Sequence, residues 1–196
     1  VILDILIISA SGLKEVSLGW AKISKDEVQA NIEEQKNNMD KILDKIESEY
    51  EVIQNFEEYI QRQCIRKKLE QDFEHFNWPE EFKELTQYYC NFQSSNIKVA
   101  YLIMDDLFNR ELKLTYNLTD TNINTVIKDI NENKSTIVAQ RYQLLFIPYT
   151  PVYYNKKIVI ILKGREYIFE VEQRFIVNLF KIFENYVTDI IATLEY

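Results

Sequence analysis

No glycine or proline occurs between Gly19 and Pro79, a stretch of 59 residues. These two residue types punctuate chains, so their absence over such a length predicts helix rather than short strands and turns. At the start of the stretch, Ser24 and Glu27 have the spacing of a capping box, which marks a helix N-terminus. We therefore expect one long helix over about residues 25–75, roughly 75 Å long at about 1.5 Å per residue.

Apolar residues recur along this stretch at spacings of three and four. Five of them are each seven residues apart: Ile32, Met39, Ile46, Ile53 and Ile60. A seven-residue repeat is typical of a helix that packs against another helix, although the companion positions of this repeat are partly polar. Three arrangements remain open: a coiled coil with another chain, a helix packed on its own domain, and a mostly exposed helix. In the first, these five residues form the interface.

The rest of the chain predicts an α+β fold. A short helix is expected over 80–89, after Pro79, and a polar stretch over 91–96 is the best domain boundary. Beyond it the expected strands are 99–104, 111–116, 137–147, 157–163 and 167–169, with a helix over 121–131 and an amphipathic helix from Glu172 onward. This order predicts a mostly antiparallel sheet backed by the last helix.

The predicted organisation has three parts. Residues 1–23 form an N-terminal strand (1–8) and a connection, residues 24–92 a helical region, and residues 93–196 an α+β domain. The apolar start of the chain is too short to span a bilayer, so no transmembrane segment is expected within it. The chain begins at Val1 rather than Met, which is compatible with a fragment or a processed form.

Composition excludes some classes of function. Only three glycines occur, and no phosphate-binding glycine loop can be built from them. The net charge of −8 argues against non-specific nucleic-acid binding, which needs a basic face. One basic cluster stands against this balance and keeps a nucleic-acid-binding subunit open as a second alternative: Arg62, Arg66, Lys67 and Lys68. The two cysteines, far apart and outside any C-x-x-C, favour a reducing, intracellular compartment, cytoplasmic or nuclear.

One acidic cluster is the leading candidate for catalysis. Asp105 and Asp106 follow an apolar strand, and Glu111 and Lys113 come shortly after them. Carboxylates of this kind hold Mg²⁺, and a lysine beside them can steady an attacking water. The cluster resembles the acidic-plus-lysine motif of restriction-type nucleases, with a shorter gap than that family has. The resemblance implies a metal-dependent hydrolase, and a charged turn is the ordinary alternative.

Several tyrosines bracket the prolines at 148 and 151, among them Tyr149, Tyr153 and Tyr154. Tyrosine is favoured at interfaces because it combines a large apolar area with a polar tip. The segment is either an exposed recognition loop or a loop folded onto the sheet.

From these patterns we expect a non-enzymatic protein–protein interaction or scaffold subunit of a larger assembly. The long helix would bind a protein partner or a second copy, and no cofactor is expected. The first alternative is the nuclease-like hydrolase with Mg²⁺.

Overall fold

The computed structural model describes residues 15–18, 21–72, 76–92, 97–165, 168 and 170–194. The chain divides into two compact units, residues 1–47 and residues 48–196. The predicted parts 1–23, 24–92 and 93–196 do not coincide with these units and stay a prediction. The strand expected over residues 1–8 lies outside the described residues.

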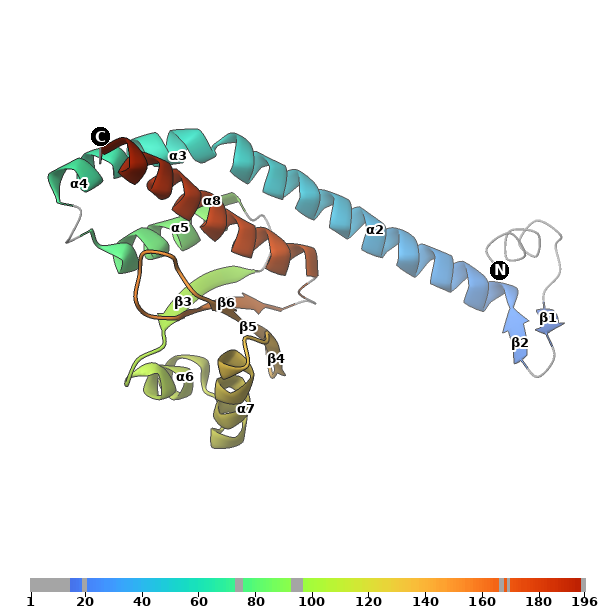
Figure 1. Ribbon diagram of the computed structural model, residues 1–196. Helices are drawn as coiled ribbons and strands as arrows, with labels where there is room; N and C mark the ends of the chain where they lie inside the picture. Colours follow the sequence, from blue (N-terminus) through green and yellow to red (C-terminus); the bar gives the residue numbers. More distant parts are fainter. Residues whose placement is uncertain are drawn as a thin grey trace. The chain divides into compact units, whose positions relative to one another are not determined.

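The first unit contains a small hairpin and most of the longest helix. Strand β1 (Glu15–Leu18) pairs antiparallel with β2 (Ala21–Ser24), and α2 (Lys25–Gln54) follows directly (Figure 1). The long helix predicted from about residue 25 is thus present. It ends at Gln54, well before residue 75, and its last turns belong to the second unit.

The second unit is built on a four-stranded antiparallel sheet in the order β3-β6-β5-β4. Its strands are β3 (Lys98–Ile103), β4 (Thr136–Ala139), β5 (Gln143–Tyr149) and β6 (Ile158–Gly164). Its helices are α3 (Phe56–Arg62), α4 (Ile65–Gln71), α5 (Trp78–Phe92), α6 (Phe108–Tyr116), α7 (Asp120–Asn131) and α8 (Glu170–Leu194). The α+β class and the antiparallel sheet are therefore confirmed.

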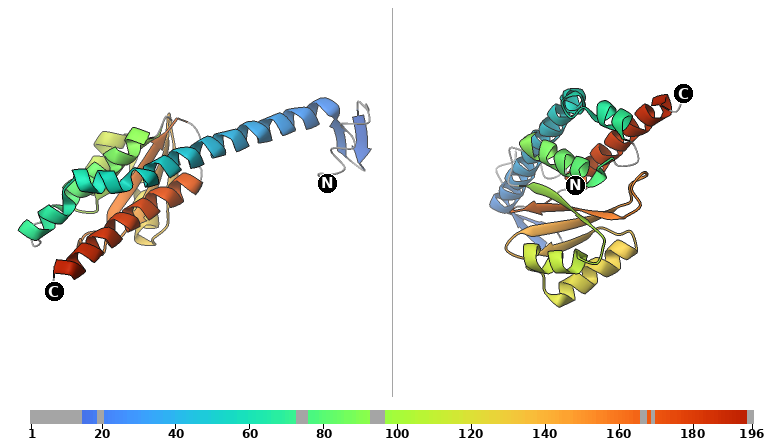
Figure 2. Two further views of the ribbon diagram at one scale, coloured as in Figure 1. Left: turned by 90° about the horizontal axis from the view of Figure 1, so that it is seen from above. Right: turned by 90° about the vertical axis from the view of Figure 1, so that its left-hand side faces the viewer.

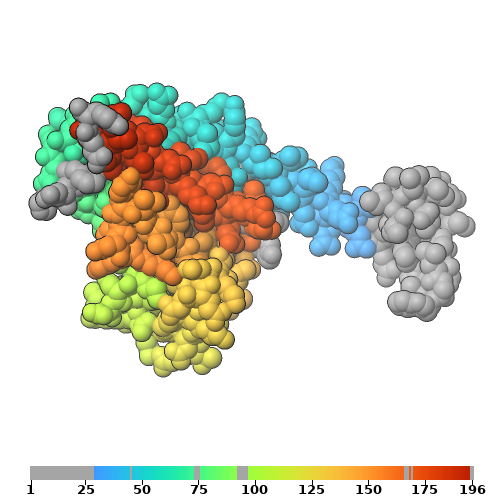
Figure 3. All heavy atoms as spheres, in the orientation of Figure 1, coloured from blue at the N-terminus to red at the C-terminus, as the bar shows by residue number. Residues whose placement is uncertain are grey.

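Helices cover both faces of this sheet (Figure 2). Because side chains alternate along a strand, β6 sends Ile158, Ile160 and Leu162 into one core and Val159 and Ile161 into the other. The first core is closed by α5, α8 and the short helices α3 and α4, and the second by α6 and α7. In Figure 3, α8 (red) and α6–α7 (yellow-green to yellow) lie on opposite sides of the unit. The predicted sheet backed by the last helix is present, and α6 and α7 form a second helical layer that the prediction did not include.

The prediction of a strand over 111–116 is wrong, because these residues belong to α6. Leu112, Leu114 and Tyr116 alternate with polar residues, as in a half-buried strand. The deciding pair is Phe108 and Leu112, which are four residues apart and both buried against the sheet, while Leu114 points to solvent. Helical spacing that began before the segment therefore prevailed over the local alternation.

Other boundaries differ from the prediction. The stretch after α2 breaks twice, at Asn55 and at Cys64, whose φ of 51° is left-handed and cannot continue a helix. The expected strand 137–147 is the hairpin of β4 and β5. No strand follows Gly164 in the described residues: Ile168 is not in a strand and α8 begins at Glu170, whereas residues 167 and 169 lie outside the described part.

Candidate functional site

An apolar stripe lies exposed on α2 within the first unit. It consists of Ile32, Met39, Leu43 and Ile46, whose side chains are 45%, 57%, 55% and 48% exposed. Spacings of seven, four and three place these four residues on one side of a helix. Contiguous exposed apolar surfaces mark interaction sites in soluble proteins.

Polar and charged residues border the stripe. Lys36, Asp40 and Glu47 lie along one flank by helical position, and all three are exposed. An exposed apolar seam with charged flanks is the arrangement by which helices select a partner helix and its orientation.

In the second unit the end of α2 has two different sides. Tyr50 and Ile53 are exposed, while Val52 is fully buried and its carbonyl accepts a hydrogen bond from the Tyr88 hydroxyl on α5. Ile60 is buried in the core on α3. Of the five residues predicted for the helix interface, four are accessible and Ile60 packs inside its own domain. The interface role of the other four stays a prediction.

The tyrosine segment folds onto the domain. Tyr149 is buried on β5, and its hydroxyl donates to Glu184 Oε2 on α8. Glu184 Oε1 accepts a second hydrogen bond, 2.8 Å long, from the backbone N–H of Val152. The pKa of Tyr149 is raised, mainly by burial and to a smaller extent by the hydrogen bond and the charge of Glu184. Glu184 therefore ties this loop to the last helix.

The two following tyrosines also find partners within the domain. The Tyr153 ring stacks on Trp78 with 6.0 Å between ring centroids and remains 37% exposed. Tyr154 is half-buried and meets Phe82 edge-on at 6.2 Å. These contacts tie the loop to α5 and α8, and the interface role of Tyr149, Tyr153 and Tyr154 stays a prediction.

The acidic cluster is not assembled as a metal site. Asp105 Oδ1 accepts from the backbone N–H of Leu107 at 2.9 Å, which is the role of a turn residue before α6. Lys113 pairs with Asp120 at 2.8 Å, and Glu111 accepts from the Thr115 hydroxyl at 3.0 Å. Asp106 lies exposed in the same turn. Among the described residues no group of three or more His, Cys, Asp or Glu side chains is placed to hold a metal ion.

The basic cluster is largely engaged by neighbouring carboxylates. Arg62 pairs with Glu58, and Arg66 pairs with Glu70 at 2.9 Å. Lys68 reaches across to Glu81 on α5 at 2.6 Å, where the carboxyl is buried. Lys67 is exposed. Because three of the four cations face acidic partners, they do not form an open basic surface for phosphates.

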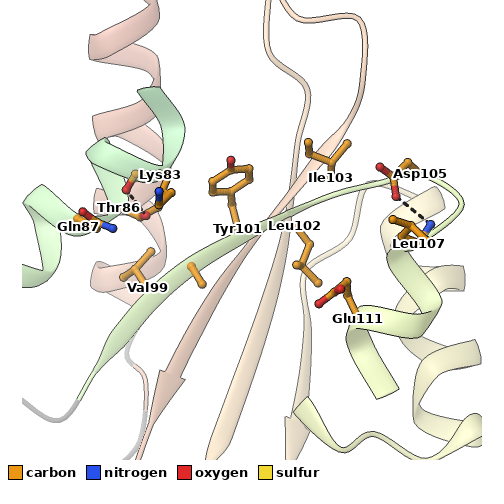
Figure 4. A pocket seen from close by; sticks show the side chains of 11 residues that line it. Lys83, Thr86, Gln87, Val99, Tyr101, Leu102, Ile103, Asp105, Leu107 and Glu111 are labelled. Carbon is orange, nitrogen blue, oxygen red and sulfur yellow. Dashed lines mark hydrogen bonds between the residues drawn. The ribbon is translucent and has the colours of Figure 1, made fainter. Parts of the chain in front are cut away.

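Sequence reasoning missed one surface, a cavity of about 480 Å³ along β3. It is lined by residues of α5, of β3 and of the segment from Asp105 to Glu111 (Figure 4). The apolar run of residues 99–104 predicts a buried strand, and nothing in it tells whether the strand lies at the edge or in the middle of the sheet. Only the strand order reveals this surface.

No helix in the described part of the chain is long and apolar enough to cross a bilayer.

Comparisons with known proteins yield little. No protein-family model matches this chain, and no curated protein matches it. A solved structure of SpoIISA and SpoIISB, a toxin–antitoxin system, aligns with 74% of this chain and 96% of that one, at 16% identity and a TM-score of 0.44. A likeness at this level concerns the arrangement of secondary structure alone and carries no argument about function.

Proposed function

We propose that this chain is a non-enzymatic interaction subunit that associates through α2, with a second copy of the same helix as its partner. The exposed apolar stripe of Ile32, Met39, Leu43 and Ile46 carries the proposal. A seven-residue repeat is self-complementary, so two copies can bury the same stripe against each other around a two-fold axis.

Burial of the stripe supplies the energy for association. A large aliphatic or methionine side chain gains about 1.5–3 kcal/mol when it goes from exposed to buried. The four stripe residues on each helix are about half exposed, so each gains about half of this amount, and their sum opposes the entropy that association costs. The flanking Lys36, Asp40 and Glu47 then discriminate between alignments through like and opposite charges.

The test is the mass of the full chain in solution, measured by sedimentation over a range of concentrations. We expect a concentration-dependent dimer for the unmodified chain. The double variant Met39→Asp/Ile46→Asp should be a monomer, because it places four charges in a dimer seam that has no room for their hydration.

A matched control adds the same two charges elsewhere on α2. Ala30 and Asn37 are exposed and lie on the opposite side of the helix from the stripe. Ala30→Asp/Asn37→Asp should therefore dimerise as the unmodified chain does. An unmodified chain that stays monomeric at all concentrations would exclude self-association. A pull-down from the source cell with both double variants would then decide whether a different protein takes the stripe.

A further inference from the structure

Strand β3 forms one edge of the four-stranded sheet, because it pairs with β6 and with no other strand of the described chain. One position beyond the last pair of the ladder, Ile103 with Ile158, the backbone N–H of Met104 donates to the carbonyl of Lys157 at 2.9 Å. Residues directly opposite in an antiparallel pair alternate between hydrogen-bonded and non-bonded positions. The N–H and C=O groups of residues 98, 100 and 102 therefore point toward β6, and those of residues 99, 101 and 103 point away from the sheet.

Part of this outer row already has partners. The N–H of Val99 meets Cys90 Sγ of α5 at 3.3 Å, and the carbonyl of Ile103 accepts from the N–H of Asp105 at 3.0 Å. The N–H and carbonyl of Tyr101 and the N–H of Ile103 make no hydrogen bond with any described residue. Three backbone groups over the middle of β3 thus have no hydrogen-bond partner among the described residues. An added strand supplies partners for groups arranged in this way.

The open groups lie on the floor of the 480 Å³ cavity. Lys83, Thr86 and Gln87 of α5 line one side of it, and Leu107 and Glu111 line the other (Figure 4). A second copy of the sheet would bring its own α5 and α6 against these two walls. A single extended segment, which carries no helices beside it, fits between them.

We propose that an extended peptide segment of a partner protein docks here as a fifth strand on β3, with an apolar residue followed two positions later by lysine or arginine. Recognition of this kind takes affinity from the backbone and specificity from alternate side chains. The proposal does not depend on association through α2.

The chemistry of the two walls sets the peptide sequence. Side chains of an added strand alternate between the α5 side and the α6 side. On the α6 side they meet Leu102 and the 56% exposed Leu107, and beyond these the carboxylates of Asp105 and Glu111. Neither carboxylate forms an ion pair within the described residues, so a cation from the peptide complements both. On the α5 side the wall is polar, and polar peptide residues suit it.

The test is selection of random heptapeptides displayed on phage against the immobilised full chain. We expect the enriched peptides to share an apolar residue with lysine or arginine two positions later. A selected peptide is then made synthetically, and its dissociation constant is measured by fluorescence anisotropy. Absence of enrichment, or enriched peptides without a basic residue, would overturn the proposal.

Two variants separate strand addition from unspecific binding. Ile103→Pro deletes an outward N–H without touching the ladder to β6, a position where edge strands tolerate proline. It should weaken binding at least about tenfold, while Ile103→Val, which keeps the N–H, should not. Equal affinity for both would contradict a backbone-paired strand.

Glu111→Lys tests the charge wall independently, in case the proline variant does not fold. Glu111 is only partly buried and holds no cation in the described chain. The variant should select peptides with aspartate or glutamate in place of the basic residue. An unchanged preference would show that the acidic wall plays no part.

Discussion

The two longest helices of this protein, α2 and α8, have the same kind of amphipathic sequence but differ in how much of their apolar face is buried. Helix α8 buries almost its whole apolar face, including Ile176, Leu179, Phe180, Phe183 and Val187. Helix α2 leaves Ile32, Met39, Leu43 and Ile46 exposed within the first unit. The comparison teaches that periodicity predicts an apolar face but does not say whether the chain itself supplies a surface to cover it.

The reason lies in what each helix meets. The face of α8 lies against strands that present Leu145, Ile147 and Ile160 toward it. Apolar side chains on both partners leave water together, which is worth about 25 cal/mol per Å² of buried surface. The stripe on α2 stays exposed within the first unit. The four predictions below test this contrast.

The largest effect is expected in α8. Phe180 is fully buried and stacks with Phe82 at 5.5 Å between ring centroids. Phe180→Ala should lower the free energy of unfolding by about 3–5 kcal/mol, because it leaves a cavity between helix and sheet. Ile182→Ala on the outer side of the same helix, where the side chain is 39% exposed, is the control and should cost far less. Denaturant unfolding measures both, and equal losses would contradict the assigned burial.

The second-largest effect is expected for the hydrogen bond between Tyr149 and Glu184, which links the tyrosine loop to α8. Tyr149→Phe removes the hydroxyl that donates to Glu184 and leaves a buried carboxylate oxygen without that partner. The free energy of unfolding should fall by about 1–3 kcal/mol. Tyr153→Phe, at a partly exposed ring, is the matched control and should change little. An unchanged free energy of unfolding for Tyr149→Phe would mean that water replaces the hydroxyl.

The ion pair between Lys68 and Glu81 should show in the pH dependence of stability. Burial raises the pKa of the Glu81 carboxyl, and Lys68 only partly opposes this. A carboxyl with a raised pKa in the folded state stabilises the fold while it is protonated, and this contribution is lost as pH rises from its usual value through the raised one. Glu81→Gln should reduce this dependence of the free energy of unfolding on pH, which denaturant unfolding at a series of pH values measures. A curve as steep for Glu81→Gln as for the unmodified chain would contradict this role of Glu81.

The smallest effect on the isolated chain is expected in the stripe itself. Ile46→Ala should change the free energy of unfolding of the monomer by no more than about 0.5 kcal/mol, as surface substitutions do. If α2 pairs with a second copy, the same change should lower the melting temperature more at high protein concentration than at low. A large loss that does not depend on concentration would show that the stripe is covered within its own chain.

Much of the fold follows from local spacing. The capping residues and the three-four repeat predicted the start of α2, and the same repeat predicted α8. The run of five apolar residues from Ile158 to Leu162 predicted a strand, and β6 is this strand, covered by helices on both faces. The misassigned segment was α6, where six alternating residues fit either periodicity.

The candidate surfaces were predicted less evenly. The exposed stripe follows the seven-residue repeat, although the same repeat placed Ile60 in it and that side chain is buried. No pattern in the sequence predicted the cavity along β3. Its existence depends on β3 lying at the sheet edge and on α5 and α6 standing beside it.

By itself, the sequence determined the periodic elements, because backbone geometry converts residue spacing directly into a face of a helix or strand. The tertiary structure alone decided which apolar faces meet, where the helical stretch after α2 breaks at Cys64, and which strand keeps open backbone groups. These features depend on contacts between residues far apart in the chain, such as Tyr149 with Glu184. Such contacts arise from the packing of whole surfaces, which local spacing does not encode.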